Sequence, residues 1–451
     1  MNFQEARQYL LERARELGIQ LEVFAQRDTS TSVRVFNGQV DEFKLSSQQG
    51  IGLRVLRNGA WGYAYTENLA REALDHALRN AQENAELVAP EEHARLVAWG
   101  EPPHLDLLGE GLSGVTVERK VQAALALESA AKAADARVVS VPYSVYSDGE
   151  GETAVANTEG LDRAYRSLHA YNYLAPLVSQ DGQNKMKMAF QFTREFEELD
   201  PTRTALEATR KAVALLGAKP APTGHFPAVI DRECMALLLV VYAGIFSAKS
   251  AQEGKSPLAG RTGSVIASER VTLRDDATLE RGMLSRPFDA EGHPSVPVTL
   301  IEGGVLNTLL HNSETAAREG TESTGHASRS YRSTMTVTPS NLFLQPGASS
   351  REDLLRELGT GLLLTDVQGV HAGANPITGD FSLQAEGFWV QDGQISHPLE
   401  IFTVAGNFLE LLQDVQNVAN DLEFHAYGAG APSVRVTRLS MGGGSAQTPE
   451  G

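Results

Sequence analysis

The chain has 451 residues, and 39 Lys and Arg against 57 Asp and Glu give a net charge of −18. This length predicts two or three domains. The charge argues against binding to a nucleic-acid backbone, which needs clustered Lys and Arg. No apolar run reaches a membrane span, and the charged start lacks a signal-peptide core, so we expect a cytoplasmic protein with no membrane contact. The single cysteine, Cys234, excludes an internal disulfide and a multi-cysteine metal site.

The amino-terminal part is predicted to combine helices with antiparallel strands. After a first helix, apolar and polar residues alternate over about 21–65. Asn37-Gly38 and Asn58-Gly59 lie between successive strand patterns and favour tight hairpin turns. A second helix is predicted from about 66 to 85. We therefore assign residues 1–87 to an N-terminal α/β hairpin subdomain.

A second unit of similar composition follows a linker. Residues 88–115 are rich in Pro, Glu and Gly, which is typical of a linker or surface excursion. Strand patterns resume over 138–192, where Asp148-Gly149 and Asp181-Gly182 interrupt them as turn signals. A predicted helix flanks this stretch on each side. Residues 116–219 are thus expected to form a second α+β subdomain.

The remaining chain is predicted to be mostly strand. Residues 220–445 are glycine-rich with repeated turn signals, and we assign them to a β-rich C-terminal domain. The apolar segment 234–246 is too short to span a bilayer and predicts one buried central helix. Cys234 at its start is expected to be a core residue, not a nucleophile. Residues 446–451 are expected to be a disordered tail. The predicted fold class is α+β.

A search for catalytic patterns finds none. The eleven histidines show no i, i+4 or i, i+5 pair and no HExxH, and no GxSxG elbow is present. Aromatic residues alternate over 169–176 (HAYNYLAP). This pattern fits a half-buried strand better than a ligand-contacting strand face, but it allows both.

Three later segments carry a family resemblance. They are GKSPLAGRTGS at 254–264 followed by LRDD, GLLLTDVQGVHAGANPITGDFSLQAEGFWVQDGQI at 361–395, and GNFLELLQDVQNVANDLEF at 406–424. In this order and spacing they closely resemble the TldD/PmbA family, once called modulators of DNA gyrase. The resemblance covers about residues 10–445.

The resemblance implies a zinc metallopeptidase framework without its zinc ligands. TldD-type members carry HExxxH on the central helix and a late cysteine. An ungapped count places the HExxxH positions near Leu239, Val240 and Gly244, and the late-cysteine region, 426–433, has no cysteine. The chain is therefore similar to the PmbA/TldE-like branch, for which we predict no catalytic residue and no bound metal, with zinc expected only on a TldD-like partner.

The resemblance also implies partners and a cleft. The expected partner is a TldD-like HExxxH subunit, in a heterodimer, or a second copy of the chain, in a homodimer, and the substrate is an extended peptide. Substrate-cleft candidates from the most recognisable segment are Asn375, Thr378, Asp380 and Phe381. The simpler interpretation is that NPITGD forms only a turn.

Three functions stay open at this point. The first is a non-catalytic subunit of a metallopeptidase complex that degrades or processes unfolded peptides. The second is a self-sufficient hydrolase of the same family, whose unconventional site would need converging groups such as His311, His326, His371 or His425 with Asp or Glu. The third is an acidic protein-binding module of the DNA gyrase modulator type.

Overall fold

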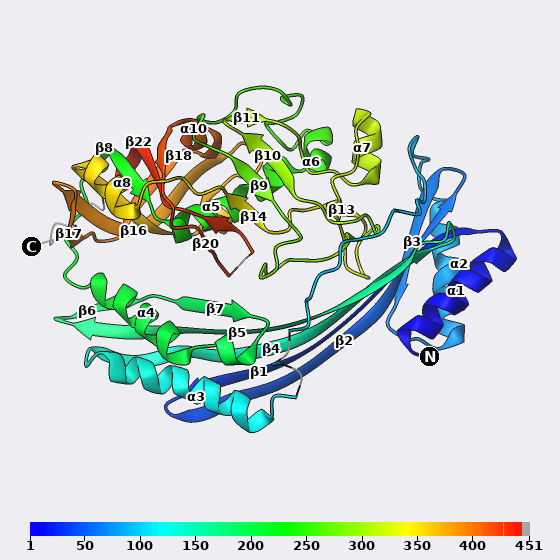
Figure 1. Ribbon diagram of the computed structural model, residues 1–451, viewed down its shortest axis with the longest axis horizontal. Coiled ribbons are helices and arrows are strands. Elements are labelled where there is room, and N and C mark those ends of the chain that lie inside the picture. The colour runs from blue at the N-terminus through cyan, green and yellow to red at the C-terminus, as the bar shows by residue number, and fades with distance from the viewer. Residues whose placement is uncertain (110, 113, 427, 444–451) are drawn as a thin grey trace, which may run out of the picture.

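The computed structural model describes residues 1–109, 111–112, 114–426 and 428–443. Over these residues the chain has an α+β fold: a long curved sheet with helices at its lower and right-hand sides, and a β-rich C-terminal domain above it (Figure 1). The predicted tail, 446–451, lies outside the described residues. None of the described helices is both long and apolar enough to cross a membrane.

The amino-terminal part is built around one sheet. Its elements are α1 (Phe3–Leu17), β1 (Gln20–Phe36), β2 (Gln39–Arg57), β3 (Ala60–Thr66), α2 (Arg71–Ala85), α3 (Val117–Ala134), β4 (Val138–Asn157), β5 (Asp162–Gln180), β6 (Gln183–Met186), β7 (Ala189–Thr193), η1 (Phe196–Glu198) and α4 (Pro201–Ala214). The sheet order is β3-β2-β1-β4-β5-β6, and β7 also pairs with β5. Because β1 pairs with both β2 and β4, strands from either side of the 88–115 segment share this sheet.

The turn signals have mixed outcomes. Asn37-Gly38 and Asp181-Gly182 adopt the positive φ angles of tight hairpin turns (52° and 74°, 50° and 80°), as predicted. Asp148-Gly149 does not form a turn; the prediction was wrong. Both residues lie inside the 20-residue strand β4, which pairs with β1 on one side and β5 on the other. The two ladders of hydrogen bonds outweigh the local turn preference.

The C-terminal domain is β-rich, as predicted. Its elements are β8 (Gly224–Ile230), α5 (Arg232–Tyr242), η2 (Ala243–Phe246), α6 (Ala248–Gln252), β9 (Leu273–Asp275), β10 (Val298–Glu302), β11 (Val305–Leu306), α7 (Ser313–Glu319), β12 (Ala327–Ser328), β13 (Thr336–Val337), β14 (Leu342–Leu344), α8 (Arg351–Leu358), β15 (Gly361–Gln368), α9 (Val370–Gly373), β16 (Asp380–Gln391), β17 (Gln394–Pro398), β18 (Phe402–Asn407), α10 (Phe408–Gln413), β19 (Val415–Val418), β20 (Glu423–Phe424), β21 (Gly430–Ala431) and β22 (Val434–Gly442). The pairing of β15 with β16 closes the strand path β15-β8-β22-β18-β16 into a ring. A second mixed sheet has the order β11-β10-β9-β14-β21-β20.

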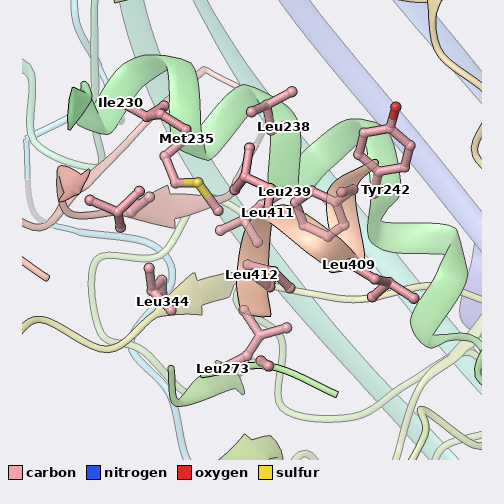
Figure 2. Packing of buried hydrophobic residues seen from close by; sticks show 14 of the residues in the cluster. Ile230, Met235, Leu238, Leu239, Tyr242, Leu273, Leu344, Leu409, Leu411 and Leu412 are labelled. Carbon is pink, nitrogen blue, oxygen red and sulfur yellow. The ribbon is translucent and has the colours of Figure 1, made fainter. Parts of the chain in front are cut away.

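The apolar segment forms the predicted buried helix, α5. Asp231 caps its first turn by accepting a hydrogen bond from the Glu233 backbone amide. Cys234 is 1% exposed, and burial raises the pKa of its thiol well above the usual value. This is a core position, as expected, and not that of a reactive thiolate. Figure 2 shows Leu239 packed beside Leu411 in the largest hydrophobic cluster of the domain.

A buried group of charges joins the two parts of the molecule. Arg54 of β2 lies 3.1 Å from Glu22 of β1 and 3.4 Å from Glu291 of the C-terminal domain. Arg329, also from that domain, lies 2.5 Å from Glu22. All four side chains are buried. We call these residues the junction cluster; its two arginines and two glutamates balance in charge.

Candidate functional site

Two adjoining cavities lie between the amino-terminal sheet and the C-terminal domain. The larger has a volume of about 620 Å³ and the smaller about 130 Å³. Met188, Phe190 and Ala426 line both, so the cavities are neighbouring parts of one groove. In Figure 1, β7 lies at the upper side of the curved sheet and faces the C-terminal domain.

Five aromatic rings form a wall of the larger cavity, which we call the aromatic cavity. The rings belong to His169, Tyr171 and Tyr173 on β5 and to Phe190 and Phe192 on β7. Successive ring centroids along β5 are 6.3 and 6.4 Å apart. Residues two apart in a strand project from the same face, which explains the row. The aromatic stretch at 169–176 is thus a strand whose rings also line a cavity.

The histidine of the aromatic wall, His169, is uncharged around neutral pH. Burial lowers the pKa of His169, and the nearby guanidinium of Arg194 lowers this pKa further. A neutral imidazole stacked 6.2 Å from Phe192 continues the apolar surface of the wall.

The smaller cavity, which we call the acidic chamber, is lined by charged residues of both parts. Its charged and titratable residues are Glu207, Lys211, Glu233, Asp366, Glu423 and His425. The Lys211 ammonium group forms an ion pair with Glu233 and a second one, at 2.7 Å, with Glu207. Burial lowers the pKa of Lys211, but these two carboxylates outweigh burial and raise it above its ordinary value. Lys211 is therefore a stable cation shared between the two carboxylates.

A second lysine repeats this arrangement beside the chamber. Lys187 forms ion pairs with both Asp366 and Glu386. Burial again lowers the pKa of this lysine, and the facing carboxylates raise it more. Each lysine thus faces two carboxylates, so each group of three carries a formal charge of −1.

The three HExxxH positions lie in different surroundings. Leu239 is fully buried in the core. Val240 lines the acidic chamber. Gly244 lies in η2, where a Cβ atom would meet no heavy atom within 4 Å. The late-cysteine region reaches the same chamber, because Ala426 and Ala429 line it together with His425.

These residues do not fit a zinc ion. Leucine, valine and glycine offer no side-chain ligand, and His425 is a single imidazole whose pKa burial lowers. Over the ranges given above, no group of three or more His, Cys, Asp or Glu side chains is arranged to hold a metal.

The four histidines considered for an unconventional site lie in three surroundings. His311 and His326 are neighbours in the core, where the His326 amide donates to the His311 carbonyl at 3.2 Å. His326 Nε2 lies 2.8 Å from Asp275 Oδ1, and both side chains are buried. His371 is exposed on α9, and His425 lines the acidic chamber. The His326–Asp275 pair joins β9 to neighbouring segments and lines none of the cavities described.

The four substrate-cleft candidates lie where a turn enters β16: Asn375 and Thr378 belong to the turn, and Asp380 and Phe381 are the first residues of the strand. The Asn375 side chain accepts hydrogen bonds from the backbone amides of Ile377 and Thr378. Thr378 Oγ1 donates to Asp380 Oδ2 at 2.7 Å. Phe381 is 6% exposed and belongs to the hydrophobic core. The polar members are exposed, and none of the four lines the aromatic cavity or the acidic chamber.

Comparison with known proteins identifies the family. Three domain families described as PmbA/TldA metallopeptidase match the chain: domain 1 at 21–85, the central domain at 110–216 and the C-terminal domain at 223–443. The chain belongs to the PmbA/TldD family. The predicted resemblance is confirmed.

Relatives match the chain over nearly their whole length. A Methanothermobacter thermautotrophicus metalloprotease is 30% identical, covering 94% of this chain and 95% of its own. Metalloprotease PmbA of Escherichia coli O157:H7 is 26% identical, with 93% of each chain covered. A Buchnera aphidicola metalloprotease TldD homolog is 26% identical over 90% of this chain and 89% of its own.

Solved structures share the fold. A candidate DNA gyrase modulator from Thermotoga maritima MSB8 is 30% identical, with a TM-score of 0.90 over 98% of this chain and 100% of that one. TldE from Thermococcus kodakarensis gives a TM-score of 0.85 at 24% identity, over 97% of this chain and 100% of that one. At that identity the second match speaks for the fold alone.

The acidic chamber was not predicted from residue patterns. The spacing of Glu207 and Lys211 indicates an i, i+4 ion pair on a helix. Nothing local places Glu233 of α5 against that pair, or Asp366 beside Lys187, because these contacts join distant segments of the chain.

Proposed function

We propose that this chain is the non-catalytic, TldE/PmbA-like subunit of a metallopeptidase complex that degrades or processes unfolded peptides. A TldD-like HExxxH subunit would supply the zinc, and this chain would supply a wall of the peptide-binding groove. One observation carries the proposal: Val240, His425, Ala426 and Ala429 line one chamber, and the described residues around it include no set of metal ligands.

The composition of the chamber supports this proposal. A zinc site needs three protein ligands and an open position for water. Here each of the carboxylates of Glu207, Glu233 and Asp366 forms an ion pair with a lysine. Lysine side chains of the protein thus partly balance these carboxylates, and none of the three can become a metal ligand without breaking an ion pair.

The groove also offers a place for an extended peptide. β7 pairs with β5 on one side, and over the described ranges no strand pairs with its other side. An open strand edge can accept an extended segment as an added strand. The strand itself lies beside both cavities, since Phe190 of β7 lines both.

The other two candidate functions have less support. A self-sufficient hydrolase needs catalytic groups beside a cavity, whereas the His326–Asp275 pair is buried among its own hydrogen-bond partners. A protein-binding module would rest on the acidic surface alone. We also propose a cytoplasmic location and a heterodimer, with the homodimer as the alternative outcome of the test below.

The test is co-expression with an HExxxH-bearing paralogue from the same genome. We expect a complex of one copy of each chain, with zinc in the partner and cleavage of an unfolded peptide only by the complex. The matched control replaces the partner's HExxxH glutamate with glutamine, which should abolish cleavage and leave the complex intact. One tightly bound zinc per chain and peptide cleavage by the isolated chain would refute the proposal.

A further inference from the structure

We propose that the aromatic cavity and the acidic chamber together select a particular class of peptide. The segment they fit is extended, carries aromatic or large apolar side chains at alternate positions, and has a basic side chain next to them. This inference rests on the proposed function, in which the groove receives a peptide, and it defines which peptides bind.

The spacing of the rings supports alternation. In an extended strand, residues two apart are separated by about 6.4–6.8 Å, twice the rise per residue. The centroids of His169, Tyr171 and Tyr173 are 6.3 and 6.4 Å apart. A peptide strand added to the same sheet beyond β7 would carry its side chains in rows with these rings, with every second side chain on the cavity face and the intervening ones on the opposite face.

The register of β7 leads to the same pattern. Phe192 stands opposite Tyr171 and Phe190 stands opposite Tyr173. A strand added to the open edge of β7 would place its own side chains directly beside Phe190 and Phe192 on the same face. Aromatic and large apolar side chains gain most at such cross-strand positions.

The rim of the groove is apolar as well. Met188 is 45% exposed and Leu284 is 41% exposed, and both line the aromatic cavity. Covering these side chains with apolar groups of a peptide removes apolar surface from water, which favours binding. Polar side chains at the same positions would lose hydration without gaining partners.

The negative charge of the acidic chamber favours a basic side chain at the part of the peptide that lies beside the chamber. Lys211 with Glu207 and Glu233 carries a formal charge of −1, and Lys187 with its two carboxylates carries another −1. The Glu423 carboxylate is balanced by Arg232. A half-buried excess of negative charge next to the aromatic wall complements a lysine or arginine side chain of the peptide.

Fluorescently labelled peptides test the selectivity by anisotropy. The alternating probe has four Phe separated by Ser, with Lys at each end; the block probe has the same composition with the four Phe contiguous. We expect the alternating probe to bind at least about tenfold tighter, since several rings each add a few-fold gain. A third probe with norleucine for Lys should bind about threefold to tenfold more weakly at low salt, and this difference should shrink as salt rises.

Variants of the wall test where selection occurs. Tyr171→Ala and Phe190→Ala should each bring the affinity ratio of alternating to block probe close to one. The ratio is insensitive to a partly unfolded sample, since both probes meet the same folded fraction. The matched control is Phe43→Ala, on β2, whose ring is 40% exposed and lines none of the cavities described; it should keep the wild-type ratio.

The outcomes separate this inference from the proposed function. All probes are measured on the isolated chain and, where it forms, on the complex with the HExxxH partner. A ratio near one in the wild type in both settings, or a ratio unchanged by Tyr171→Ala, overturns the selectivity. An active zinc-bearing complex without selectivity overturns only this inference, and selectivity without any zinc-bearing complex overturns only the proposed function.

Discussion

Ionic groups lie in two places where the parts of the molecule meet, and the two places differ in burial and in net charge. The junction cluster has two arginines and two glutamates, all buried, and adjoins no described cavity. The lysine groups at the acidic chamber are half-buried, line or adjoin a cavity, and carry an excess of negative charge. The junction cluster carries no net charge and adjoins no described cavity. The lysine groups carry a net negative charge beside a cavity, which is why the chamber and not the junction cluster is a candidate for recognition.

The largest expected effect comes from unbalancing the junction cluster. Glu22→Gln should lower the free energy of unfolding by about 3–5 kcal/mol, because it leaves Arg54 and Arg329 buried without their shared carboxylate. Urea unfolding measures this. The matched control, Glu16→Gln, breaks the exposed Arg13–Glu16 pair and should change stability by less than about 1 kcal/mol. Equal effects of the two changes would contradict the structural role of the cluster.

The same cluster predicts a loss of stability in acid. Burial raises the pKa of Glu22, but Arg54 and Arg329 outweigh burial and hold this pKa below its ordinary value. A carboxyl whose folded-state pKa is depressed stabilises the fold fully above its unfolded value, and that contribution is lost as pH falls through the folded pKa. The wild type should therefore lose stability below about pH 4.5, and Glu22→Gln should lose less over that range.

The next largest effect compares two neighbours on α5. Leu239→Ala should lower the free energy of unfolding by about 2–5 kcal/mol, since it opens a cavity in the core. Val240→Ala removes two methyl groups at the wall of an existing cavity and should change it by about 1 kcal/mol or less. Thermal and urea unfolding of both variants measure the difference. Similar losses would mean that the two side chains do not differ in burial as described.

A smaller effect is expected at the acidic chamber. Lys211→Met leaves Glu207 and Glu233 facing each other and should lower the free energy of unfolding at neutral pH by about 1.5–3 kcal/mol. The deficit should shrink in acid, where the carboxylates become protonated. In the wild type the Lys211 pKa is raised above 10.5, so its contribution is complete below that value and is lost as pH rises through the folded pKa. A deficit that does not depend on pH would contradict this electrostatic origin.

The smallest effect concerns the turn that carries the substrate-cleft candidates. Thr378→Ala removes a hydroxyl that donates to Asp380 Oδ2 and accepts from the Asp380 amide at the exposed turn, and it should change stability by about 0.5 kcal/mol or less. If the residues serve only the turn, affinity for the alternating probe should stay within about twofold of the wild type. A tenfold loss of affinity without loss of stability would instead place the peptide at Thr378.

Much of the fold could be predicted from local signals. Asn37-Gly38 and Asp181-Gly182 form the expected turns because each supplies two residues that tolerate positive φ. The same reasoning failed at Asp148-Gly149, since a strand paired on both sides can hold a turn-forming dipeptide extended. The family segments at 254–264, 361–395 and 406–424 identified the family.

The sequence by itself determined the local elements, the buried helix α5 and membership of the family. These depend on neighbouring residues, on apolar periodicity and on residue identities at fixed spacings. Only the tertiary structure decided that the rings of β5 and β7 line a cavity beside Val240 and His425, and that Lys211 and Lys187 each face two carboxylates. These juxtapositions join segments up to about 250 residues apart. Packing of the whole chain brings them together, and no local preference encodes it.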